Sequence, residues 1–201
     1  MKLFLNKASP YARLVMVVIH EKRLADRVEL MWTDPWASPP ELLAVNPAAK
    51  VPALLTDGGL PIIDSVCICT HLDDIGSGAR LLPEAAFERV PALMKYGLGR
   101  GLIDVAFGVT IERRYSNPDG KSWLAERWLT AVQRTIAALE KDPALMGANE
   151  QPDIGDLAIA VGLAYVEFRL QEVHWRDSAP TMAIWLDRIS ERASLRLTKP
   201  E

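Results

Sequence analysis

Two short stretches of the sequence place polar side chains where a chain could hold a small anionic group. Ser9 stands before Pro10 at the start of an apolar run, and Asp64-Ser65 opens a second such run. Ser and Asp before a helical segment are typical N-caps, and Pro is favoured at the first helical position. The free amides and the dipole of a helix N-terminus also favour negative charge. Each stretch therefore predicts a helix start that could also bind an anion.

Ser9 has the more specific chemistry. A thiolate that accepted a hydrogen bond from its hydroxyl, beside the free amides, would have a lowered pKa because its charged form is the one stabilised. Tyr11 carries a second hydroxyl in the same stretch and could donate that bond instead. From the residues alone, capping without catalysis stays open for Ser9 and for Asp64-Ser65.

Lys50-Val51-Pro52 begins the next informative stretch. A proline lacks the N–H that a strand donates, so it belongs at a strand's beginning or in a special turn. Two apolar segments follow it on either side of Asp57-Gly58-Gly59, which predicts a hairpin over 51–63. The cis isomer is uncommon at X-Pro bonds, so the sequence does not predict which isomer is present.

Cysteine and histidine offer little more. Cys67 and Cys69 point to different faces if their segment is helical, which argues against a bridge or a shared metal. Cys67 and His71 are four residues apart and could form a nucleophile and base, but two packed helix residues are the favoured interpretation, because a free cysteine commonly behaves as a small buried hydrophobic residue. The three histidines of the chain show no ligand spacing, so no metal site is expected.

The first part of the chain alternates strands and helices. The apolar patterns predict strands at 2–5 and 27–33, a helix from Ser9-Pro10 to about residue 24, a short helix near Pro39 or Pro40, the hairpin, and a helix from Asp64-Ser65 to Gly76. A helix between the first two strands favours a parallel pair, and the hairpin adds an antiparallel one.

Strand patterns stop after residue 85. Helical periodicity continues over 85–114, 121–141, 151–170 and 179–192, and the composition changes at 76–86. The sequence thus predicts an α/β domain at 1–77, a linker at 78–85 and an all-α domain at 86–201.

Composition excludes several classes of function. The 201 residues are 49% hydrophobic and 24% charged, with a net charge of −3 and no basic stripe, so a nucleic-acid partner is not expected. The N-terminus has no secretion signal, and the longest apolar run, 157–166, is shorter than the roughly 20 residues that span a bilayer. We expect a cytoplasmic protein without a membrane anchor.

The motifs "SPYAR", "NPAAKVPAL" and "DSVCICTHLD", in that order and before an all-helical half, resemble the cytosolic glutathione transferase family, in its bacterial, serine-type form. The likeness covers essentially the whole chain. "PDIGDLAIA" at 152–160 is similar to the family's helix-start motif, with Asp153 as cap and Asp156 as its partner. The resemblance implies a thioredoxin-like domain followed by a helical bundle, in a homodimer.

The resemblance also implies roles for single residues. Ser9 would stabilise the glutathione thiolate, and Val51 would pair its backbone with the cysteinyl part of glutathione beside a cis-Pro52. Asp64 and Ser65 would hold the γ-glutamyl end, with Asp64 one methylene shorter than the family's usual Glu or Gln. Lys50 would reach the glycyl carboxylate.

The second substrate is expected on the long helix. "GLIDVAFGVTIERR" at 101–114 resembles the helix that lines the family's second pocket, for which the candidate wall residues are Tyr11, Ile103, Phe107 and Thr110. Asp104 would extend toward the partner subunit's site.

The implied function is a glutathione transferase. It would use glutathione as cosubstrate and no prosthetic group, and would activate the thiol for attack on a small hydrophobic electrophile, as in detoxification. Other glutathione-dependent reactions (peroxide reduction, dehalogenation or isomerisation) stay open, because the fold does not determine the second substrate. A non-catalytic adaptor on the same fold is the alternative of another class.

Overall fold

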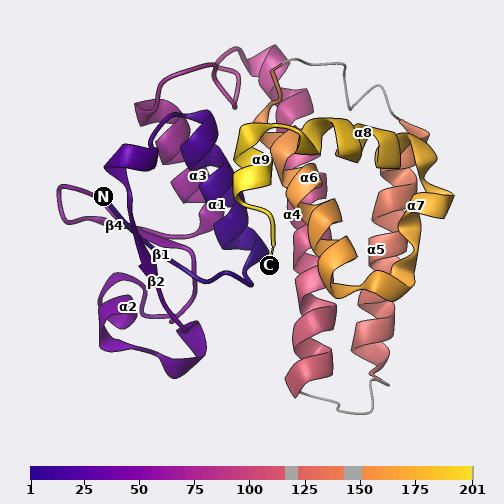
Figure 1. Cartoon of the computed structure of the whole chain (residues 1–201), viewed down its shortest axis with the longest axis horizontal. Helices are drawn as coiled ribbons and strands as arrows, with labels where there is room; N and C mark the ends of the chain where they lie inside the picture. The colour runs from indigo at the N-terminus through magenta and orange to yellow at the C-terminus, as the bar shows by residue number, and fades with distance from the viewer. Residues whose placement is uncertain (116–121, 143–150, 201) are drawn as a thin grey trace. The chain divides into compact units, whose positions relative to one another are not determined.

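The computed structural model describes residues 1–115, 122–142 and 151–200. The chain divides into two compact units (Figure 1). Unit 1 comprises Met1–Leu82 and Ala193–Glu201, and unit 2 comprises Pro83–Arg192. The division between Leu82 and Pro83 falls inside the stretch where the sequence predicts a linker.

Unit 1 is built on a four-stranded sheet with the order β2-β1-β3-β4. Its strands are β1 (Lys2–Leu5), β2 (Glu29–Trp32), β3 (Ala53–Leu55) and β4 (Pro61–Ile62). β1 pairs in parallel with β2 and antiparallel with β3, which pairs antiparallel with β4. The predicted parallel pair and hairpin are therefore confirmed. Gly59 in the hairpin turn has a φ of 77°, a conformation that glycine adopts without steric cost.

Helices cover the sheet of unit 1. They are α1 (Pro10–Glu21), α2 (Pro40–Val45) and α3 (Ser65–Ile75), with short 3₁₀ turns at Ala25–Arg27 and Pro35–Ala37. α1 buries an apolar face that includes Leu14, Val17 and Val18 and packs beside α3. α2 contributes Leu42 and Val45 to a separate cluster with Phe4 and Ala53. The result is the expected thioredoxin-like domain.

The last helix, α9 (Ala193–Leu197), belongs to unit 1, whereas the sequence places it in the helical domain at 86–201. Its contacts explain the difference. Ser194 donates a hydrogen bond to Glu21 Oε1 at 2.5 Å, and the carbonyl of Leu195 accepts one from Arg13 Nη2 at 3.3 Å. Both partners lie on α1, which periodicity in the last residues could not indicate.

Unit 2 is helical throughout its described residues. It contains α4 (Ala86–Tyr115), α5 (Trp123–Lys141), α6 (Ile154–Arg169), a 3₁₀ turn (Gln171–Val173), α7 (Trp175–Ser178) and α8 (Pro180–Ser190). α6 is buried along most of its length and packs against α4, so it forms the centre of this unit. The predicted all-α C-terminal region is confirmed, because every element of regular secondary structure described after residue 85 is helical.

α6 begins with the capping box that its sequence resembles. Asp153 Oδ1 accepts from the backbone amides of Gly155 and Asp156 at 2.8 and 3.0 Å, and Asp156 Oδ2 accepts from the Asp153 amide at 3.0 Å. Two carboxylates in one cap would repel each other, but Lys95 of α4 brings its ammonium to within 2.5 Å of Asp153 and 2.7 Å of Asp156. This buried lysine makes the reciprocal cap of two aspartates possible.

Across the described parts of the chain, no helix combines the length and the apolar character that crossing a membrane requires.

Candidate active site

The sheet topology of unit 1 brings the three predicted binding segments to one edge. β1 and β3 are antiparallel, so the carboxyl end of β1, which leads to Ser9, lies beside the start of β3 after Pro52. β3 and β4 are also antiparallel, and Leu54 pairs with Ile62, so the end of β4 that leads to Asp64 reaches the same edge. α1 and α3 both begin at this edge, which therefore collects two helix N-termini.

Ser9 is the N-cap of α1 and its side chain is buried. The hydroxyl oxygen accepts a hydrogen bond from the Ala12 amide at 3.2 Å, Ser9 has an extended backbone, and Pro10 starts the helix. A hydroxyl has one hydrogen to donate and two lone pairs. Because the cap uses a lone pair, the O–H remains available to donate, and capping does not compete with binding an anion.

The loop before Ser9 is fixed by Asn6, which the sequence analysis did not single out. Asn6 donates from Nδ2 to the Thr33 carbonyl at 3.1 Å, and its Oδ1 accepts from the Ala8 amide at 3.0 Å. Its own carbonyl accepts from the Ser9 amide at 3.1 Å. An Asn side chain that accepts a hydrogen bond from the amide two residues later is typical of turns, so Asn6 was a sequence signal for a turn before Ser9.

The Val51–Pro52 peptide bond is cis, as the resemblance implies. Pro52 is buried and immediately precedes β3, while Val51 is half-buried. The loop before it depends on Asn46, a buried residue that donates from Nδ2 to the Lys50 carbonyl at 2.9 Å and accepts from the Ala48 amide at 3.1 Å. Asn46 is a second positioning residue missed at the sequence level, although its Asn-Pro pair is a turn signal.

Asp64 and Ser65 start α3, as predicted. Asp64 is the N-cap, and its Oδ1 accepts from the Val66 amide at 2.9 Å. Asp64 is exposed whereas Ser65 is buried, and the Ile63–Asp64 peptide bond is also cis. An exposed carboxylate beside free helix amides can bind an ammonium group and a carboxylate of one ligand together.

The other predicted residues differ in exposure. Lys50 is exposed and Tyr11 is half-buried, both in unit 1. In unit 2, Phe107 and Thr110 are half-buried on α4, where Thr110 Oγ1 donates to the Ala106 carbonyl at 3.0 Å. Ile103 has no exposed surface, so it lies beneath the surface residues of that helix. Asp104 is exposed and lies 3.5 Å from Arg100 of the same helix.

Cysteine and metal chemistry receive no support at this edge. Cys67 is exposed and Cys69 buried on α3, so the two point to different faces as expected, and neither forms a disulfide. Within the described ranges, no three His, Cys, Asp or Glu side chains gather in a way that could hold a metal ion.

Comparisons with known proteins agree with this geometry. The family model described as "Glutathione S-transferase, N-terminal domain" matches residues 8–75. The crystal structure of a glutathione transferase family member from Pseudomonas fluorescens Pf-5 with bound glutathione is 32% identical, covers 100% of this chain and 98% of its own, and has a TM-score of 0.92.

Two further relatives extend over the same length. A Pseudomonas fluorescens Pf-5 family member with bound S-(propanoic acid)-glutathione is 32% identical, with 100% of both chains covered and a TM-score of 0.88. The "Uncharacterized GST-like protein YibF" of Escherichia coli (strain K12) is 24% identical over 205 residues, which are 100% of this chain and 98% of that protein. By full-length identity and fold, this chain belongs to the glutathione transferase family.

Proposed function

We propose that the protein is a glutathione transferase that activates the glutathione thiol for attack on a small hydrophobic electrophile. The observation that carries the proposal is the edge of the unit 1 sheet where Ser9, the cis Val51–Pro52 bond and Asp64-Ser65 come together. That edge offers the Ser9 hydroxyl as a donor, the backbone of Val51 and the carboxylate of Asp64 at the start of α3. All three belong to unit 1. These are the groups that a peptide thiol needs for binding.

Ser9 supplies the activation. When bound glutathione loses its thiol proton to solvent, the Ser9 O–H donates to the sulfur, and the nearby helix dipole stabilises the same negative charge. Both effects favour the thiolate over the thiol, so they lower the pKa of the bound sulfur. The thiolate then attacks the electrophile to form a thioether, and any leaving group departs with the bonding electrons.

Other residues at the same edge bind the remaining parts of glutathione. Val51 offers its backbone to the cysteinyl part of glutathione, Asp64 and Ser65 bind the γ-glutamyl end, and Lys50 reaches the glycyl carboxylate. The Pseudomonas fluorescens Pf-5 relatives hold glutathione and an S-substituted glutathione, which supports a conjugation reaction here. The predicted contacts of the electrophile remain Tyr11, Ile103, Phe107 and Thr110.

The test is Ser9→Ala compared with Ser122→Ala. Both serines are N-caps, since Ser122 Oγ accepts from the Leu124 and Ala125 amides at the start of α5. Each alanine variant loses a cap worth about 1 kcal/mol of stability. We expect Ser9→Ala to lower kcat/KM for a generic aryl halide at least tenfold and to raise the apparent pKa of the bound thiol, while Ser122→Ala keeps both values.

Calorimetric titration with glutathione separates binding from activation. Saturable binding by wild type and by Ser9→Ala, with activity lost in the variant, supports the assigned role. An unchanged rate in Ser9→Ala would transfer the role to Tyr11 or to backbone amides. The absence of any binding by wild type at millimolar glutathione would contradict the proposed function and favour a non-catalytic adaptor.

We further propose that the protein is a cytoplasmic homodimer. The first half of α4 exposes Phe87, Val90, Leu93 and Met94, and Phe87 is 89% exposed. Apolar side chains at this helical spacing form one surface that a second copy can bury. Light scattering of the purified chain should give twice the 22.3 kDa mass of the monomer, and a single-chain mass would contradict the proposal.

A further inference from the structure

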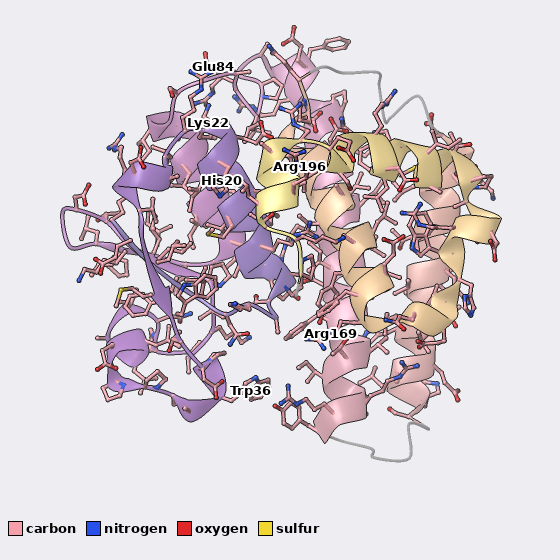
Figure 2. The ribbon with its side chains drawn as sticks, viewed as in Figure 1. His20, Lys22, Trp36, Glu84, Arg169 and Arg196 are labelled. Carbon is pink, nitrogen blue, oxygen red and sulfur yellow. The ribbon has the colours of Figure 1, made fainter. Side chains whose placement is uncertain are left out.

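The end of α6 carries an arginine beside the α4 residues that are predicted to contact the electrophile. Arg169 is the last residue of α6, and its side chain is exposed. Figure 2 labels it beside α4, the helix against which α6 packs. Tyr165 lies four positions earlier on α6, so the two side chains share one face of that helix.

Tyr165 connects Arg169 to Thr110 of α4. Burial raises the pKa of the Tyr165 hydroxyl, while a hydrogen bond with Thr110 and the charge and hydrogen bond of Arg169 oppose the rise. Thr110 donates its own hydrogen to the Ala106 carbonyl at 3.0 Å, so Tyr165 is the donor in the bond with Thr110. The Tyr165 oxygen then accepts from Arg169. This chain of bonds fixes the guanidinium relative to a predicted contact of the electrophile.

The ring of Phe168 holds the same guanidinium. The Arg169 Cζ atom lies 4.3 Å from the centre of that ring, within the range of an attractive cation–π contact. A guanidinium has several N–H donors, and the Tyr165 oxygen accepts from only one side of the group. Arg169 is therefore held in place while other donors of its guanidinium remain available to a ligand.

No acidic side chain compensates the charge of Arg169. Among the residues that the structure describes, no carboxylate forms an ion pair with it. The two acids closest to it in the sequence have other partners. Glu167 pairs with Arg176 at 2.5 Å, and Glu172 pairs with Arg113 at 2.6 Å. An anionic group of a ligand can therefore supply the missing counter-charge.

The adjoining surface of α4 is apolar. Phe107 and Ile111 are both half-buried, and they lie three positions before Thr110 and one after it. Side chains at positions 107, 110 and 111 share one face of the helix, so the hydrocarbon of this face adjoins the hydroxyl that Tyr165 contacts. Such a surface suits a flat hydrocarbon body with one acidic group at its end.

We propose that the electrophiles of this protein carry a carboxylate and that Arg169 binds it as the specificity-determining residue. The inference rests on the proposed transferase function and names the class of its second substrate. The guanidinium donates parallel hydrogen bonds to the carboxylate and so orients the electrophile. The glutathione thiolate forms the new bond to the electrophilic carbon, and the leaving group departs with its bonding electrons. Tyr165 is a positioning residue, because it acts through Arg169.

The test compares 4-chloro-3,5-dinitrobenzoate with 4-chloro-3,5-dinitrobenzamide, which have similar shapes and differ in charge. In both compounds the thiolate attacks the carbon that bears chlorine, and chloride leaves. Each kcat/KM is divided by the rate constant of the uncatalysed reaction with glutathione, which removes the difference in intrinsic reactivity. We expect wild type to prefer the benzoate at least tenfold, Arg169→Met to lose this preference, and Arg169→Lys to keep part of it.

Arg188→Met is the matched control. Arg188 is an exposed arginine in the last turn of α8, as Arg169 is in the last turn of α6. Both variants therefore lose the same favourable interaction with a helix C-terminus. Arg188→Met should keep the preference for the benzoate. Tyr165→Phe should weaken the preference several-fold by raising KM for the benzoate, which a general loss of stability would not do selectively.

Binding of the reaction product gives a readout without turnover. In calorimetric titration, S-(4-carboxy-2,6-dinitrophenyl)glutathione should bind Arg169→Met at least tenfold more weakly than wild type. The inference is overturned if wild type shows no preference for the benzoate, if Arg169→Met retains it, or if Arg188→Met loses it. Turnover of the benzamide without a preference for the benzoate overturns this inference alone. Turnover of neither compound by wild type contradicts the proposed function and this inference with it.

Discussion

Among its described residues, each unit of the molecule buries one lysine, but the two lysines have different surroundings. In unit 1, Lys22 at the end of α1 (Figure 2) donates to the Ala79 carbonyl at 2.9 Å and pairs with Asp73 of α3. Asp73 also accepts from the Leu81 and Leu82 amides at 2.9 and 3.0 Å. In unit 2, the ammonium of Lys95 joins two carboxylates, Asp153 and Asp156.

The difference is one of charge and of hydrogen-bond donors. Burial alone would raise the pKa of Asp73, but the two amides and the Lys22 ammonium outweigh it and hold that pKa below its usual value. Burial raises the pKa of Asp156, and the neighbouring Asp153 carboxylate adds to the effect in spite of Lys95. A buried lysine thus accompanies a stabilised carboxylate in one unit and a destabilised one in the other.

Both lysines also lie against a glycine. A side chain on Gly76 would meet the Cβ of Lys22, and a side chain on Gly155 would meet the Cβ of Lys95. Both clusters therefore place a glycine against the buried lysine, but they shift the pKa of the buried aspartate in opposite directions. Burial raises the pKa of both aspartates, so the acids and amide donors around each buried lysine decide whether the pKa of its aspartate is finally lowered or raised.

The largest effect is expected from Lys95→Met. Removal of this ammonium leaves two neighbouring carboxylates without a counter-charge at the start of α6, which should lower the free energy of unfolding by about 3–5 kcal/mol. Urea unfolding followed by tryptophan fluorescence measures the change. Lys141→Met, an exposed lysine at the end of α5, is the matched control and should shift stability by about 0.5 kcal/mol or less. Equal stability of Lys95→Met and the control would contradict the electrostatic account of the cap.

A smaller loss is expected from Lys22→Met. Asp73 keeps its two amide donors and lies 3.7 Å from the Arg80 guanidinium, so the variant should lose about 2–3 kcal/mol. Hydrogen exchange should show the loss in peptides of α1 and α3. The exposed Lys2, which lies 3.6 Å from Glu29, gives the control Lys2→Met with little expected change. A loss as large as that of Lys95→Met would show that the amides do not compensate.

The smallest effect is a difference in pH dependence. The pKa of Asp73 is lowered on folding, so its contribution is present above the unfolded value of about 4 and is lost as the pH falls further. The pKa of Asp156 is raised on folding, so its contribution is present below about pH 4 and is lost as the pH rises through the folded value. Between pH 3 and 7, α1 and α3 should therefore gain protection from hydrogen exchange while α4 and α6 lose some.

Two single variants test this pH dependence. Asp73→Asn should reduce the acid sensitivity of α1 and α3, and Asp156→Asn should reduce the loss of protection of α4 and α6 as the pH rises. A trend with the same sign in both units of wild type would contradict the assignment.

Local sequence patterns predicted most of the helices and strands, and also the two helix starts at the candidate site. The Ser9-Pro10 and Asp64-Ser65 helix starts and the turn at Gly59 each depend on residues close together in the chain, so their chemistry is visible in a few letters. The parallel and antiparallel strand pairs follow from the order of those elements.

The features that sequence reasoning missed depend on distant residues. A lysine in a helical pattern reads as exposed, and Lys95 meets Asp156, 61 positions away, only after α4 and α6 pack. Arg13 and Leu195, 182 positions apart, are a stronger case. The cis isomer of Pro52 was implied by the family resemblance and not by the local residues, because both isomers are accessible to an isolated X-Pro bond.

The position of α9 has a consequence for how the protein is made. Unit 1 consists of the first residues of the chain and some of the last, so a ribosome completes unit 2 before it supplies the helix that contacts α1. Domains generally fold in the order of their synthesis. Here the first unit to emerge lacks α9 until residues 193–197 have been made, so during translation the partners of α9 on α1, Glu21 and Arg13, are without it.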